Sequence, residues 1–177
     1  MESTAARGDS VATAGPPDSL KAGVGLMALG AAAFGAYAVV FFVRNFTDAF
    51  LELGIGHEQV DVGKDEIEAF SPSLQDYVSH LHIAVSGFIL ATAIAVLFLA
   101  VFGVWRGYLW AWIGAVIAPV VGLAVAIPAH YPFGFDTLGH LGGIYLATLI
   151  FVIGAVIALR PLLEARRRGV KPAARLE

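Results

Sequence analysis

The stretch AGVGLMALGAAAFGAYAVVFFV, residues 22–43, contains no charged side chain. The hydrocarbon core of a bilayer is about 30 Å thick and is crossed by about 20 apolar residues in an α-helix. Inside lipid every backbone polar group must be bonded within the protein, so such a run favours a helix over an open strand. Three further uncharged runs occupy residues 83–105, 108–127 and 141–159. The sequence therefore predicts four transmembrane helices, at about residues 22–44, 72–105, 108–128 and 137–163.

The composition supports an integral membrane protein of the all-α class. Hydrophobic residues make up 58% of the 177 residues and charged residues only 14%, whereas a soluble domain carries about 25% charged residues. The expected partner of the chain is thus a lipid bilayer, and no nucleic-acid partner is predicted. Cysteine is absent, which excludes disulfides, thiolate metal ligands and a thiol nucleophile.

The chain divides into three parts. Residues 1–20 are small and polar, with two prolines, and we expect a disordered tail. Residues 21–165 form the predicted four-helix membrane domain, and residues 166–177 a basic tail. The first two helices are joined by a long acidic loop, in which residues 45–53 suit either a short interfacial helix or an irregular segment, and residues 54–70 read as exposed. Ser71-Pro72 is a helix-start signal, because serine caps and proline suits the first turn.

The distribution of basic residues predicts the orientation. The segment after residue 159 is strongly basic, with Arg160, Arg166, Arg167, Arg168, Lys171 and Arg175. Cytoplasmic flanks of membrane helices are enriched in lysine and arginine. We therefore expect a multi-pass protein of the cell membrane with both termini cytoplasmic (N-in, C-in). The acidic loop and all five histidines then lie on the extracytoplasmic side.

Two Asp-x-x-x-His pairs supply the candidate site: Asp76 with His80, and Asp136 with His140. Residues four apart are neighbours on a helix. At about 100° per residue, each pair shares a face with small residues, which we expect to point inward. Gly87, Ala91 and Ala95 mark that face on the second span, and Gly139, Gly143 and Ala147 mark it on the fourth. His82 is then expected to point away from the bundle.

These positions predict a site at the extracytoplasmic mouth of the bundle. Imidazole and carboxylate together suit divalent transition metals, and the predicted metal ligands are Asp76, His80, His130, Asp136 and His140. A haem with His80 and His140 as axial ligands is the redox version of the same site.

The same pairs also have a purely structural explanation. Aspartate near a helix start caps free N–H groups, and histidine is stable at a membrane interface. The leading function is thus a small membrane protein that binds a metal, a haem or another small ligand. The alternatives are an accessory subunit that packs in a homo-oligomer or a larger complex, and a transporter. No motif assigns a catalytic activity.

Overall fold

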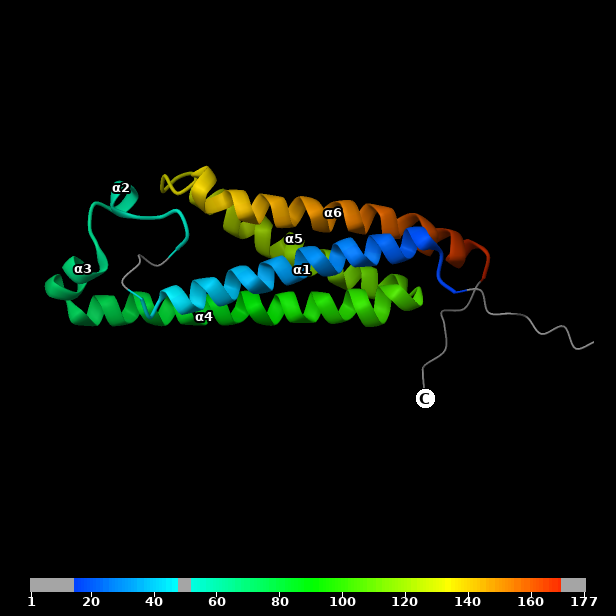
Figure 1. Cartoon of the computed structure of the whole chain (residues 1–177), viewed down its shortest axis with the longest axis horizontal. Coiled ribbons are helices and arrows are strands. Elements are labelled where there is room, and N and C mark those ends of the chain that lie inside the picture. Colours follow the sequence, from blue (N-terminus) through cyan, green and yellow to red (C-terminus); the bar gives the residue numbers. More distant parts are fainter. Residues whose placement is uncertain (1–14, 48–51, 170–177) are drawn as a thin grey trace, which may run out of the picture.

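The computed structural model describes residues 15–47 and 52–169. Four long helices run side by side: α1 (Asp18–Arg44), α4 (Pro72–Phe98), α5 (Leu109–His130) and α6 (Leu138–Arg167) (Figure 1). Each is long and apolar enough to cross a membrane, which fits a multi-pass membrane protein. No strand occurs among the described residues, so the predicted all-helical fold with four apolar spans is confirmed.

The connections contain more helix than the sequence suggested. The segment expected to be an exposed loop holds α2 (His57–Val60) and α3 (Lys64–Phe70), neither of which buries a residue. After α4 the chain continues through a π-helical turn, η1 (Leu99–Gly103), and a 3-10 turn, η2 (Val104–Arg106). The predicted start at Pro72 is correct, and the Ser71 side chain accepts a hydrogen bond from the Leu74 N–H at 3.3 Å.

Three expectations fall partly outside the described residues. The disordered tail was predicted for residues 1–20, but only residues 15–20 are described, and α1 already begins at Asp18. Of the interfacial segment 45–53, residues 48–51 lie outside the described chain. Residues 170–177 of the basic tail also lie outside it, whereas α6 extends to Arg167.

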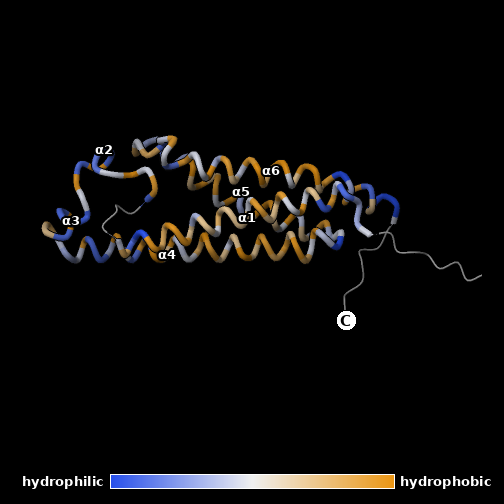
Figure 2. Tube along the Cα trace, viewed as in Figure 1, coloured by the Kyte–Doolittle hydropathy of each residue, from blue (hydrophilic) through white to orange (hydrophobic). Residues whose placement is uncertain are grey.

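The bundle has two unlike ends. Of the described residues, the loop end carries 45–47, 52–71 and 131–137, and the basic end carries Lys21, Arg106 and residues 160–168. In Figure 1 the loop end lies at the left, with α2 and α3, and the basic end at the right. Figure 2 shows the hydrophobic stretch of the long helices between hydrophilic segments at both ends. This pattern matches helices that span lipid and end in water.

Glycines hold α1 against α6 along most of their length. A Cβ atom added at Gly23 would lie 2.6 Å from the Ala158 nitrogen, and one at Gly154 would lie 2.6 Å from the Met27 nitrogen. Such distances allow no side chain, so the two backbones touch. Small residues permit this approach in lipid, where dispersion contacts and packing drive helix association.

The inward face predicted for the second span is wrong. Gly87, Ala91 and Ala95 are exposed on α4, whereas Ala93 and Val96 are buried. Small residues can also face lipid, so their spacing alone does not define the packed face. The consequence for the histidines of this helix is described below.

Candidate metal centre

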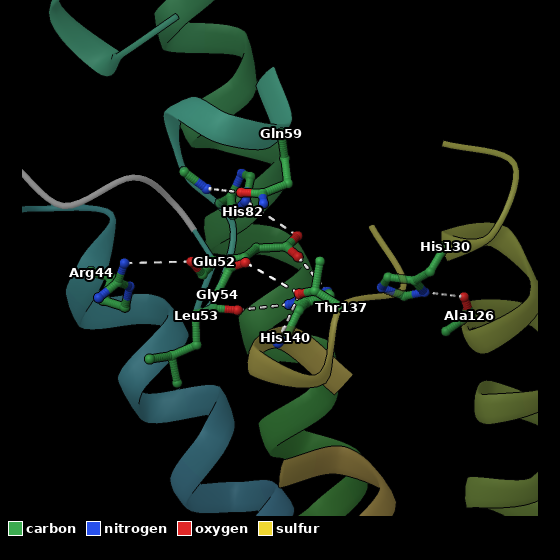
Figure 3. A network of polar contacts seen from close by, with 11 residues as sticks. Arg44, Glu52, Leu53, Gly54, Gln59, His82, Ala126, His130, Thr137 and His140 are labelled. Atoms are coloured by element: carbon green, nitrogen blue, oxygen red, sulfur yellow. Dashed lines mark hydrogen bonds and ion pairs between the residues drawn. The ribbon is translucent and has the colours of Figure 1, made fainter. Parts of the chain in front are cut away.

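His140 is the buried centre of a polar cluster at the loop end (Figure 3). It lies in the first turn of α6, where the Thr137 hydroxyl accepts a hydrogen bond from the His140 N–H at 3.2 Å. Only 2% of the residue is exposed. Its ring Nδ1 lies 2.9 Å from the backbone oxygen of Leu53. A carbonyl can only accept, so Nδ1 carries a proton and Nε2 is the ring nitrogen that faces the cluster.

Glu52 reaches His140 because the loop before α2 is docked on the start of α6. Gly54 has a φ of 75°, and a Cβ there would come under 3.0 Å from the backbone of Gly139 and His140. This position therefore needs glycine both for its conformation and for its space. From the end of α1, the Arg44 guanidinium donates to the backbone carbonyl of Glu52 at 3.4 Å. The result is a distance of 2.9 Å between a Glu52 carboxylate oxygen and His140 Nε2.

His82 and His130 approach the same carboxylate and imidazole from α4 and α5. His82 Nδ1 lies 3.0 Å from the Val78 carbonyl, and His130 Nδ1 lies 2.7 Å from the Ala126 carbonyl. Both rings therefore donate through Nδ1 to the preceding turn of their own helix, as His140 does to the loop. His82 Nε2 lies 3.6 Å from the second Glu52 oxygen. The rings of His130 and His140 have centroids 4.9 Å apart.

Glu52, His130 and His140 are spaced to hold one metal ion. Their ligand atoms lie within 4.8 Å of one another. In a tetrahedral site, bonds of about 2.0–2.2 Å place the ligand atoms about 3.3–3.6 Å apart, so the most widely separated pair would close by up to about 1.5 Å around an ion. The Nε2 atoms of His82 and His140 are buried, and each faces an oxygen of the Glu52 carboxylate, at 3.6 Å and 2.9 Å. Buried polar atoms are nearly always bonded, so Nε2 of His140 binds the carboxylate through a proton or through a metal ion.

The charge of Glu52 suits a cation. Burial raises the pKa of the Glu52 carboxyl, but the imidazoles of His140 and His82 outweigh this effect and hold the pKa at about 2. The group is therefore a carboxylate at neutral pH, which is the form that binds metals. With Nδ1 of His140 protonated, a neutral ring would place a lone pair 2.9 Å from this carboxylate. Either a second proton or a metal ion must bridge two such electron-rich atoms.

The structure separates the five sequence-predicted ligands into two groups. His130 and His140 meet in the cluster. Asp76, His80 and Asp136 are exposed and do not belong to the group of residues spaced for a metal ion. The inward orientation expected for Asp76 and His80 is thus wrong, and so is the outward orientation expected for His82.

The reason lies in the packed face of α4. With His82 at zero and about 100° per residue, Ala93 falls near 20° and Val96 near −40°. Both are buried, so His82 shares the packed face. His80 is about 160° away from His82 on the same helix. Because the two histidines are two residues apart on the helix, His82 faces the bundle and His80 faces away from it.

Glu52 was missed because its sequence context does not set it apart. It is one of many acidic residues between the first two spans. Its role depends on a contact between residues far apart in the chain, the docking of Gly54 on Gly139. A glycine two residues after an acid is the only local trace of that contact, and it is too common to identify the ligand.

Comparison of the chain with models of known protein families, with curated proteins and with solved structures finds no match. The chemistry of the loop end is therefore the basis for assigning a function.

Proposed function

We propose that this multi-pass membrane protein binds one divalent transition-metal ion at the loop end of its bundle. The ligands are Nε2 of His130, Nε2 of His140 and the carboxylate of Glu52. One observation carries the proposal: the backbone fixes both imidazoles with Nδ1 protonated, which leaves both Nε2 atoms as ligands beside an ionised carboxylate. Histidine ligands of metals are typically oriented in this way, through the proton on the other ring nitrogen.

The ligand set indicates which ions fit. Two imidazoles and one carboxylate suit zinc, iron(II), manganese(II) and their neighbours better than calcium or magnesium, which prefer oxygen ligands. Three protein ligands leave at least one coordination position for water or another molecule. His82 lies beyond the three ligands and contacts the second oxygen of Glu52 at 3.6 Å. It is a positioning residue, which holds the carboxylate in the orientation that faces His140.

The arrangement favours a metal ion over the other functions predicted from the sequence. A haem with His80 and His140 as ligands needs both rings in one cavity, but His80 is exposed while His140 is buried. Purified protein is therefore expected to lack a Soret band. Among the described residues, no specific observation favours an accessory subunit or a transporter over a metal-binding protein.

Metal loading of the purified full chain tests the proposal. Protein stripped with a chelator is offered Zn²⁺, Fe²⁺, Mn²⁺ or Co²⁺ singly, and bound metal is measured by elemental analysis after gel filtration. We expect one ion per chain, lost in Glu52→Gln, His130→Ala and His140→Ala. His80→Ala is the matched control, because it removes an imidazole that is exposed on α4.

Two outcomes would contradict the proposal. One is a wild-type chain that binds none of the four ions at stoichiometric level while it elutes as a folded species. The other is a loss of metal in His80→Ala equal to that in His140→Ala, which would favour the sequence-predicted ligand set. Circular dichroism of each variant separates loss of a ligand from loss of the fold.

We also propose that the loop end faces away from the cytoplasm. The support is the gathering of Lys21, Arg106, Arg160 and Arg166 to Arg168 at the opposite end, which agrees with the excess of positive charge on cytoplasmic flanks. The native chain has no cysteine, so single-cysteine variants report without background. In intact cells an impermeant thiol reagent should label Glu68→Cys and not Arg168→Cys. The reverse labelling would overturn the orientation.

A further inference from the structure

An apolar cavity of about 330 Å³ lies between the four long helices. This volume is at the lower end of the range for small-molecule sites, about 300–1,000 Å³. Its wall includes Phe34 of α1, Thr92 of α4, Gly122 of α5, and Thr148 and Phe151 of α6. These positions lie in the middle part of their spans.

The cavity exists because α5 packs tightly only at the basic end. Its buried residues are Ala111 and Ala115, both in its first turns. Farther along, the wall is made by the small residues Ala118, Gly122 and Ala126. A Cβ added at Gly122 would meet nothing within 4 Å, so the side of α5 that faces the bundle has open space there.

The lining is apolar except for the hydroxyls of Tyr37, Thr92 and Thr148. The Thr92 hydroxyl donates to the Phe88 carbonyl at 2.8 Å, and the Thr148 hydroxyl donates to the Ile144 carbonyl at 2.7 Å. Both hydroxyls are thus bonded within their own helices. Water needs two to four polar partners to be stable in a cavity. An unfilled gap, in turn, costs its walls their dispersion contacts, so an apolar occupant is favoured.

The dimensions restrict that occupant to a single hydrocarbon chain. The wall on α5 runs from Ala118 to Ala126, which is about 12 Å along a helix axis. A helix with its side chains is about 10–12 Å in diameter, so a cavity of about 330 Å³ does not enclose a helix of a second copy over this length, whereas an acyl chain is thin enough to lie within it.

The end of the cavity nearest the loops borders the metal ligands. Ala126 belongs to the cavity wall, and its carbonyl accepts the Nδ1–H of His130 at 2.7 Å. We propose that the cavity binds the acyl chain of a single-chain membrane amphiphile, whose polar head lies beside His130 at the loop end. The binding of the chain does not depend on the metal. The placement of the head rests on the proposed function, where a vacant coordination position would accept a carboxylate oxygen.

Photolabelling of the reconstituted full chain tests this site. The probe is palmitic acid with a diazirine in mid-chain, added to phosphatidylcholine vesicles that contain the protein, and labelled peptides are mapped by mass spectrometry. We expect saturable labelling of the segments around Gly122 and Thr148, suppressed by excess palmitate. Lipid-facing segments should label in proportion to the probe, without saturation.

Two leucine substitutions provide a matched pair. Gly122→Leu fills the cavity, and we expect at least a fivefold loss of saturable label. Gly87→Leu adds the same side chain at an exposed glycine of α4 with nothing within 4 Å, and the label should equal that of the wild type. Equal saturable labelling of Gly122→Leu and wild type would overturn the proposal. A dimer of the wild-type chain that is lost in Gly122→Leu would also overturn it.

Metal content measured on the same samples keeps the two proposals distinct. Gly122→Leu should retain its metal, and His130→Ala should retain the saturable label at mid-chain while it loses metal. Loss of label in Gly122→Leu with full metal content would support the cavity site alone. A wild type with metal but without saturable label would overturn the cavity site and leave the metal site standing.

Discussion

The two ends of the bundle are built in opposite ways. Toward the basic end the helices share one buried apolar cluster, which includes Met27, Val104, Ala111 and Ala158. There the Trp112 indole also donates to the Ala155 carbonyl at 2.9 Å. Toward the loop end an apolar cavity separates α5 from the other spans, and polar contacts of Glu52, Gly54 and the histidines replace apolar packing. The comparison indicates that one end secures the fold while the other carries the chemistry.

The largest expected loss of stability comes from a substitution at the packed contact of α1 with α6. Gly23→Leu places a side chain where a Cβ would lie 2.6 Å from the Ala158 nitrogen. Overpacking usually costs about 1–3 kcal/mol, and a clash with backbone should exceed the upper value. Thermal unfolding in detergent, followed by circular dichroism, should show a large destabilisation together with loss of metal.

The control for this variant lies two residues along the same helix. Gly25→Leu adds the same side chain at an exposed position with nothing within 4 Å. Its unfolding temperature should match that of the wild type. Equal destabilisation of both variants would show that the contact of α1 with α6 does not dominate stability.

The next largest effect is the dependence of metal affinity on pH, which concerns only the loop end. The neighbouring Glu52 carboxylate raises the pKa of the His140 imidazole above its usual value. A metal ion at Nε2 must displace that proton, so below the raised pKa its apparent affinity should fall by about tenfold per pH unit. Glu52 adds no slope above about pH 4, because its pKa is lowered to about 2. Titration of Zn²⁺ against a competing chelator measures the slope, and a flat profile would exclude His140 as a ligand.

An intermediate loss of metal affinity is expected from a substitution where the loop docks on α6. Gly54→Ala keeps every ligand but forces a Cβ onto the backbone of Gly139 and His140 at a φ of 75°. The strain should cost about 1–3 kcal/mol locally, and metal affinity should fall about 10–100-fold, as when partners of ligands are lost. Gly56→Ala is the control, since a Cβ there meets nothing within 4 Å. Metal affinity of Gly54→Ala equal to that of Gly56→Ala would show that the docking does not position Glu52.

The smallest effect should come from His82. His82→Ala removes a contact with Glu52 at 3.6 Å without removing a proposed ligand, so we expect about a tenfold loss of metal affinity. His82→Gln should restore part of it, because the amide can donate to the carboxylate. Isothermal titration with Zn²⁺ measures both variants. A loss as complete as that in His140→Ala would reclassify His82 as a ligand.

The sequence predicted the membrane-spanning helices better than the candidate site. Uncharged runs locate four spans because the bilayer imposes their length and apolar character, and Ser71-Pro72 marked the start of α4 correctly. His140 was found through its spacing from Asp136, although Asp136 itself is exposed and does not belong to the group spaced for a metal ion. The choice of His80 over His82 failed because it relied on Gly87, Ala91 and Ala95, which are exposed.

Glu52 could not be inferred for a different reason. Its partners, His140 in α6 and His82 in α4, lie far from it in the chain. The packed face of α4 was readable in principle, since Gln75, Ser86, Ala93 and Val96 are its buried residues and fall within about 40° of His82. In a helix that is apolar on all sides, however, the hydrophobic residues show only a weak periodicity. Residues that contact protein and residues that contact lipid are then equally hydrophobic, so the packed face does not stand out.

The position of His130 at the last residue of α5 has a mechanical consequence. Near the loop end α5 has no buried residue of its own, yet an ion bound to His130, Glu52 and His140 would tie it to the docked loop and to the first turn of α6. Such a tie would set how far α5 can swing from its neighbours, and with it the width of the gap beside Gly122. Binding of the ion at the loop end would then govern access to the cavity, and a chelator should loosen the half of α5 near His130 while leaving Ala111 and Ala115 in place.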